Sequence, residues 1–198
     1  GKTFTALRLA EQYAENNGGR ARVLFLVPSI SLLSQTLKEW TAQNQEHLPL
    51  KSYAVCSDTK VSKKAEDIAS YDLEVPVSTN GKDIAERTAQ GKRRKGLNVV
   101  FSTYQSIEAI HEAQTLGMDD FDLVICDEAH RTTGVTLAGE DASNFVRIHD
   151  ADYIKANKRL YMTATPRLFD DTVKGKAEEH SAELASMDDE AVYGPEFY

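Results

Sequence analysis

The sequence has few of the residues that mark several protein classes. It contains two cysteines, one tryptophan and five prolines among 198 residues. Cys56 and Cys126 lie far apart in apolar surroundings, which excludes a disulfide scaffold and a structural zinc site and predicts buried free thiols in a reducing compartment. No apolar run approaches the roughly 18–20 residues that span a bilayer, and because Gly1-Lys2-Thr3 leads into a polar helical pattern we expect no secretory signal peptide. We therefore expect a cytoplasmic protein without membrane contact.

The sequence also lacks an excess of basic residues. It has 23 Lys and Arg against 31 Asp and Glu, a net charge of −8. This excludes a uniformly basic nucleic-acid binder but leaves room for a local groove that binds nucleic acid. The basic run 92–95 could contact phosphates or form a solvated helix end. Because Gly1 is not a natural start, we expect these residues to be part of a longer polypeptide.

Apolar runs and helical spacings alternate along the chain. Strands are predicted by continuous apolar runs or by alternation of apolar and polar residues. Such segments occur at 22–28, 51–56, 97–102, 122–127 and 158–164. Spacings of three and four residues predict helices over 3–16, 31–43, 80–95 and 104–115. The alternation indicates an α/β fold with three layers and a mainly parallel sheet.

The segments between and after these elements have no clear period. We interpret 57–78 as a surface excursion, 128–157 as a loop with a short helix near 143–150, and the residues after Pro166 as a polar helix and a loose tail. From these patterns we predict that residues 1–166 form one domain and that residues 167–198 form a helix and a connector.

Gly1-Lys2-Thr3 stands directly before a predicted helix. A phosphate-binding loop needs a lysine for the β- and γ-phosphates, a Ser or Thr hydroxyl for Mg²⁺, and a helix N-terminus that favours anions. The tripeptide has these features, but neither the earlier glycine of such a loop nor its preceding strand is in the sequence. By itself it is weak evidence.

Two more polar segments follow strands that the sequence predicts to be buried. Asp127-Glu128-Ala129-His130 comes after one strand and Thr163-Ala164-Thr165 after another. Acidic groups beside a buried strand are costly unless they bind a cation or activate water. Asp127 could hold Mg²⁺, and Glu128 could orient and deprotonate a water molecule. The carboxyl ends of parallel strands share one edge of a sheet, where ligands bind.

These segments occur in the order found in the first motor domain of superfamily 2 helicases and translocases, which the chain resembles. Gly1-Lys2-Thr3 resembles the end of motif I, Asp127–His130 is similar to a DEAH box, and Thr163-Ala164-Thr165 resembles motif III. The resemblance implies a RecA-like fold whose first strand, with the phosphate loop, is missing here. It also implies ATP and Mg²⁺ as cofactors, with Gly1, Lys2 and Thr3 binding nucleotide and Thr3 and Asp127 binding the metal.

The resemblance extends to catalytic, coupling and DNA-binding residues. It implies catalytic roles for Lys2, Asp127 and Glu128. It implies coupling of nucleotide state to movement by His130, Thr163, Ala164 and Thr165. Residues that resemble the nucleic-acid motifs at strand ends would contact DNA, and these are Pro28, Ser29, Gln35, Ser102, Thr103, Tyr104 and Gln105. Tyr104 could instead cap the edge of the core.

A closer resemblance links two phrases, 24–36 and 186–190, to the translocase segment of type ISP restriction-modification enzymes. It implies an ATP-dependent motor that moves along duplex DNA, with ATP bound between this domain and a second motor domain of the same chain. A general DNA or RNA helicase, a non-motor ATPase with a phosphate loop and a module that only binds partners remain alternatives. The sequence does not decide between duplex and single-stranded tracks.

Overall fold

The computed structural model describes residues 1–56, 77–89, 95–136, 143–179 and 182–195. The excursion predicted over 57–78 and the basic run 92–95 lie almost wholly outside the described residues. The elements follow in the order α1 (Lys2–Asn16), β1 (Arg20–Val27), α2 (Ile30–Gln43), β2 (Leu50–Val55), β3 (Val77–Ser78), α3 (Gly81–Ala89), β4 (Gly96–Thr103), η2 (Tyr104–Ser106), α4 (Ile107–Thr115), β5 (Phe121–Cys126), η3 (Ala129–Thr132), β6 (Gly134–Thr136), η4 (Arg147–His149), β7 (Ala156–Tyr161), α5 (Asp171–Glu179), β8 (Glu183–Ala185) and α6 (Glu190–Tyr193).

The centre of the fold is a six-stranded sheet in the order β3-β2-β4-β1-β5-β7. All of its pairs are parallel. β1 lies between β4 and β5, and its residues from Val23 to Val27 are all buried. This burial on both faces explains why the strand reads as a continuous apolar run. The predicted parallel α/β fold is confirmed, although β7 ends at Tyr161 rather than at residue 164.

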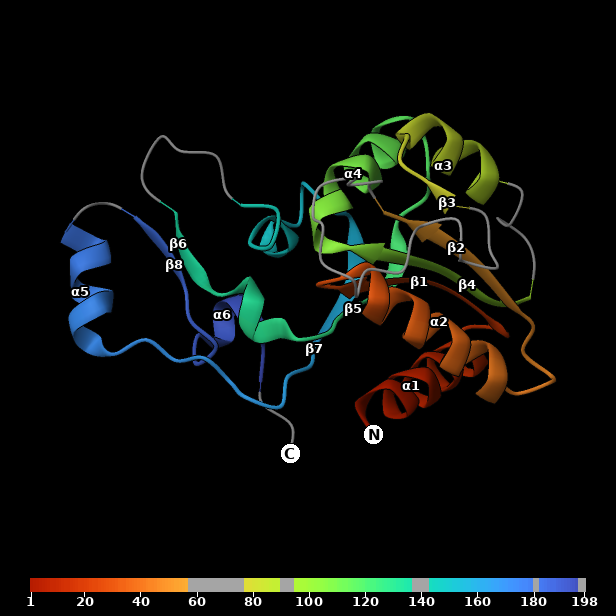
Figure 1. Cartoon of the computed structure of the whole chain (residues 1–198), viewed down its shortest axis with the longest axis horizontal. Helices are drawn as coiled ribbons and strands as arrows, with labels where there is room; N and C mark the ends of the chain where they lie inside the picture. Colours follow the sequence, from red (N-terminus) through yellow and green to blue (C-terminus); the bar gives the residue numbers. More distant parts are fainter. Residues whose placement is uncertain (57–76, 90–94, 137–142, 180–181, 196–198) are drawn as a thin grey trace.

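Helices cover both faces of the sheet and make three layers (Figure 1). Val23, Phe25 and Val27 of β1 pack in one core with residues of α1 and α2. Leu24 and Leu26 point to the opposite face and pack in a second core with residues of α3 and α4. Because successive strand residues alternate between faces, a single apolar strand supplies both cores.

The C-terminal part of the chain differs from the prediction. The expected loose tail is wrong for residues 183–193, because β8 pairs antiparallel with β6 and α6 follows it. The hydroxyl groups of Tyr193 and Thr132 lie 3.0 Å apart, which joins α6 to the end of η3. The ribbon of β6 and β8, with α5 beside it, stands at the left of the sheet in Figure 1.

The prediction of buried thiols agrees with the structure. Neither Cys56 nor Cys126 forms a disulfide, and both side chains are buried. In the parts of the chain that the structure describes, no helix combines the length and the apolar character needed to cross a bilayer.

Candidate functional site

The predicted catalytic residues meet at the carboxyl edge of the sheet. The Lys2 Nζ atom lies 2.7 Å from Glu128 Oε1 and 3.8 Å from Asp127 Oδ1. Lys2 is the first residue of α1, and the two acidic residues follow the last residue of β5. The sheet therefore brings together residues that are far apart in the sequence, as the motif order predicts.

Gly1, Lys2 and Thr3 form the N-terminal end of α1. The carbonyl of Gly1 accepts hydrogen bonds from the amides of Phe4 and Thr5, so the helix is regular from its first turn. The carbonyl of Thr3 accepts the indole N–H of Trp40 at 3.2 Å, which ties this turn to α2. A helix N-terminus favours a bound anion through its free amides and its dipole. The geometry thus fits a phosphate group next to Lys2.

Asp127 is buried and held in place by backbone contacts. Its amide donates to the carbonyl of Leu26 at 2.9 Å, which continues the pairing of β5 with β1. Its Oδ1 accepts the amide N–H of Glu128 at 2.9 Å. Burial raises the pKa of the Asp127 carboxyl, and the hydrogen bond from Glu128 and the charge of Lys2 oppose that effect. A buried carboxylate beside a cation is a suitable ligand for Mg²⁺.

Glu128 has an unusual backbone conformation. Its φ of 49° and ψ of 46° are left-handed, and no other non-glycine residue among those described has a positive φ. Such a conformation costs a residue with a side chain roughly 1–2 kcal/mol and recurs at functional sites. Side chains of Glu128 and Lys2 keep about a third of their surface exposed. The ion pair is therefore accessible to a ligand from solvent.

The predicted coupling residues are also in contact with the acidic segment. His130 Nδ1 lies 2.9 Å from Thr163 Oγ1 and 3.4 Å from Glu128 Oε2. The hydroxyl of Thr163 donates to the carbonyl of Thr165 and accepts its amide. Ala164 and Thr165 are exposed. A continuous set of contacts thus runs from Lys2 through Glu128 and His130 to Thr163.

The predicted DNA-binding residues divide into two groups. Gln35 and Gln105 are exposed, and Gln105 Nε2 donates to the carbonyl of Pro28 at 3.4 Å. Ser29 caps α2, since its hydroxyl accepts the amide of Leu32. These residues follow β1 and β4, whose carboxyl ends lie side by side in the sheet.

The other group points into the protein. Ser102 and Thr103 are buried, and their hydroxyls bond within the turn to Thr103 O and to Ser106 Oγ. Tyr104 is fully buried, and its hydroxyl donates to the carbonyl of Asp127 at 2.9 Å. The side chain of Tyr104 therefore belongs to the core, which corrects the prediction that it contacts DNA.

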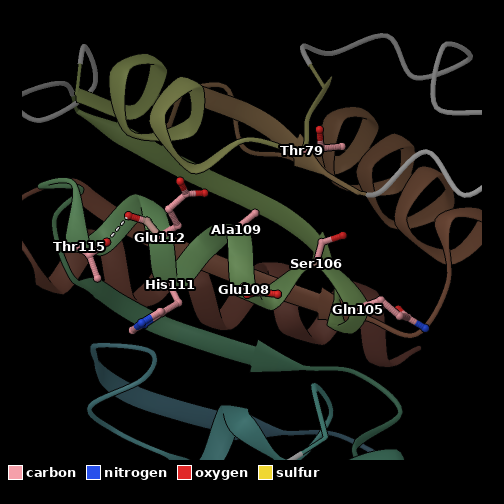
Figure 2. A pocket seen from close by; sticks show the side chains of 8 residues that line it. All are labelled: Thr79, Gln105, Ser106, Glu108, Ala109, His111, Glu112 and Thr115. Atoms are coloured by element: carbon pink, nitrogen blue, oxygen red, sulfur yellow. Dashed lines mark hydrogen bonds between the residues drawn. The ribbon is translucent and has the colours of Figure 1, made fainter.

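A surface cavity of about 450 Å³ lies along α4 (Figure 2). Eight residues line it, and they are Thr79, Gln105, Ser106, Glu108, Ala109, His111, Glu112 and Thr115. It adjoins the exposed Gln105 of η2, but neither Lys2 nor Glu128 contributes to it. The cavity is thus separate from the acidic site.

A bound Mg²⁺ would have few protein ligands at this site. Among the residues that the structure describes, no group of three or more His, Cys, Asp or Glu side chains could hold a metal ion. Mg²⁺ commonly takes one or two protein oxygen ligands and completes its shell with water and phosphate. The hydroxyl of Thr3 and the carboxylate of Asp127 are oxygen donors of the required kind.

Sequence reasoning missed the half-buried network beyond the acidic segment. The ring of His149 bonds to Tyr161 OH through Nδ1 and to the carbonyl of Thr132 through Nε2. Tyr193 packs edge-on against both His149 and Tyr161. No local pattern marks these residues, because they come from four separate segments.

Comparisons with solved structures agree with the geometry. A DNA-bound structure of the ATP-dependent type ISP restriction-modification enzyme LlaBIII is 41% identical, with a TM-score of 0.74 over 98% of this chain and 13% of that one. A nuclease-deletion mutant of the type ISP enzyme LlaGI, in complex with a DNA substrate mimic, is 40% identical, with a TM-score of 0.73 over 98% of this chain and 14% of that one.

Sequence comparisons agree as well. The "Probable helicase A859L" of African swine fever virus, isolate Pretoriuskop, is 33% identical over 168 residues, which are 84% of this chain and 16% of the relative. The chain thus spans about a sixth of the length of these helicase relatives. Residues 1–168 match the family described as the type III restriction enzyme, res subunit. With the expected motifs gathered at one edge of a RecA-like sheet, the chain belongs to this family of helicase-like motor domains.

Proposed function

We propose that the protein containing this chain hydrolyses ATP with Mg²⁺ and uses the energy to move along DNA, as part of a restriction-modification enzyme. The proposal is carried by one observation. A continuous set of contacts joins Lys2, Glu128, His130 and Thr163. A phosphate-binding lysine, an acidic pair and a hydroxyl at a neighbouring strand end are the parts that an ATP-driven motor needs in one place.

Each residue of the site has a separate role in the proposed hydrolysis. The amides at the start of α1 and the ammonium of Lys2 bind the phosphates. Thr3 and Asp127 hold Mg²⁺, which when bound neutralises charge on the phosphate oxygens. Glu128 orients the attacking water and accepts its proton, since its carboxylate is partly exposed beside Lys2. His130 and Thr163 transmit the state of the site to the rest of the motor.

The DNA-binding surface is proposed at the carboxyl ends of β1 and β4. Exposed Gln35 and Gln105, with Ser29 and backbone groups near Pro28 and Thr103, would bind one sugar–phosphate backbone. Such contacts position a protein without reading sequence, which suits a motor that moves over any sequence. The net charge of −8 is compatible with this, because hydrogen bonds from amides and side chains need no basic surface. A second motor domain of the same chain would close the nucleotide site.

Two assays on the intact protein test the proposal. The first compares ATP hydrolysis with and without duplex DNA, and we expect stimulation by DNA. The second follows the ATP-dependent displacement of a triplex-forming oligonucleotide, which a duplex translocase removes without separating the strands of its track. Glu128→Gln is expected to abolish both signals, while Glu15→Gln, at the exposed far end of α1, serves as the matched control. Strand separation without triplex displacement would favour the alternative of a general helicase.

A further inference from the structure

Successive residues of the turn η2 face opposite environments. Gln105 is exposed, and Figure 2 shows its side chain extending away from the start of α4. Its Nε2 reaches the carbonyl of Pro28, so this residue joins the ends of β4 and β1. Tyr104, the residue before it, is fully buried and reaches the carbonyl of Asp127. The turn therefore touches the proposed DNA surface on one side and the acidic segment on the other.

The peptide group between Asp127 and Glu128 is held at both of its polar atoms. Its carbonyl oxygen accepts the hydroxyl of Tyr104 at 2.9 Å, and its N–H donates to Asp127 Oδ1 at 2.9 Å. Directly after this peptide, the backbone of Glu128 is left-handed. Strained backbone persists only where surrounding contacts fix it. Tyr104 supplies one of these two contacts, and it is the one that comes from outside the acidic segment.

Tyr104 is itself held firmly. Its ring stacks on Phe145, with ring centroids 5.0 Å apart and planes inclined by 26°. The carbonyl of the next residue, Gln105, accepts the side-chain amide of Asn144 at 3.1 Å. Because the Tyr104 side chain is fixed in this way, a displacement of η2 would also move the hydroxyl that contacts the Asp127 carbonyl oxygen.

We propose that Tyr104 is a positioning residue, which links DNA held at Gln105 to the orientation of the catalytic Glu128 through the Asp127 carbonyl. This rests on the proposed function, because it assigns the DNA stimulation of ATP hydrolysis to a defined contact. Tyr104 touches neither nucleotide nor DNA in this proposal. It acts by fixing the peptide that carries the group activating water.

The test uses the intact protein and two matched substitutions. Tyr104→Phe keeps the buried ring and removes only the hydroxyl. Tyr53→Phe is the control, because Tyr53 is also buried and its hydroxyl also donates to a backbone carbonyl, that of Arg87, at 3.1 Å. Misplacing a catalytic group through a supporting contact costs about 10- to 100-fold in activity. We therefore expect kcat with duplex DNA to fall by about that factor in Tyr104→Phe and to stay within twofold in Tyr53→Phe.

Separate measurements distinguish positioning from a merely structural role. We expect the KM for ATP and the Kd for DNA to stay within twofold in Tyr104→Phe, while the ratio of DNA-stimulated to basal turnover falls. A merely structural role would lower the thermal unfolding midpoint of both variants alike and leave this ratio unchanged. An unchanged ratio in folded Tyr104→Phe overturns the positioning role alone. Absence of DNA stimulation in the unsubstituted protein overturns the proposed function, and the positioning role with it.

A second substitution keeps the test decisive if Tyr104→Phe does not fold. Phe145→Leu removes the ring that stacks on Tyr104 but leaves its hydroxyl in the chain. We expect it to lower the stimulation ratio as well, because the hydroxyl is then less firmly placed. A stimulation ratio within twofold of the unsubstituted protein would overturn the proposal.

Discussion

Replacing Glu128 by glycine and by alanine tests the strain at the acidic segment. A left-handed backbone costs a residue with a Cβ roughly 1–2 kcal/mol and costs glycine almost nothing. In the opposite direction, glycine lowers the free energy of unfolding relative to alanine by about 0.4–1 kcal/mol, because it raises the conformational entropy of the unfolded chain. The ion pair with Lys2 is lost in both variants, so it cancels from the comparison. We expect Glu128→Gly to be more stable than Glu128→Ala by about 0.5–1 kcal/mol.

Urea unfolding measures this difference. If the free energy of unfolding falls by about 2 kcal/mol per molar urea, the unfolding midpoint of Glu128→Gly should lie about 0.2–0.5 M above that of Glu128→Ala. At an unstrained site the order is the reverse, because alanine is then the more stabilising residue. A higher midpoint for Glu128→Ala would show that the left-handed geometry carries no strain. ATP turnover, assayed on the same preparations, should be lost in both variants and lowered by about 10²–10⁴ in Glu128→Gln, with ATP binding retained.

Three further predictions concern the nucleotide, the isolated chain and pH. Lys2→Ala should weaken both ATP binding and hydrolysis, in contrast to Glu128→Gln, as measured by nucleotide titration and phosphate release. Residues 1–198 alone should show negligible DNA-stimulated phosphate release, because the family resemblance places ATP between two motor domains and an arginine finger alone is worth about 10³–10⁵ in rate; turnover within tenfold of the intact protein would contradict this. Burial lowers the pKa of His149, so its contribution to stability is present above about pH 6.5 and is lost as pH falls through the lowered value. The unfolding temperature should therefore fall less between pH 7.5 and 5.5 in His149→Gln than in the unsubstituted protein, and equal falls would refute the assignment.

The parts of the fold that could be predicted share a strong local signal. The run from Val23 to Val27 is apolar throughout because both faces of β1 are covered, and this also identified it as a strand of a parallel sheet. The meeting of Lys2 with Asp127 and Glu128 followed from the motif order of the family that the chain resembles, together with the rule that parallel strands present their carboxyl ends at one edge. Local pattern and motif order were sufficient for these features.

Other features depend on contacts between distant segments. β6 and β8 have three residues each, which is too short for a periodic pattern. The direction of the Tyr104 side chain after β4 is decided by its contacts with Phe145 and Asp127, and nothing in the neighbouring sequence indicates these contacts. The left-handed backbone of Glu128 was likewise hidden, since glutamate does not favour it. Such features are set by packing that the local sequence does not encode.

The central position of β1 has a consequence for how the chain folds. Arg20 pairs with Gly96 and Val23 with Leu123, so β1 is synthesised well before either of its neighbours in the sheet. Parallel pairing over such separations is slow, because the loop must close before any contact forms. During synthesis the apolar side chains of β1 therefore have no partner strand and can associate with other unfinished chains. We expect ribosome-bound chains that end shortly after α2 to need chaperones, and chains that extend past β5 to be released from them.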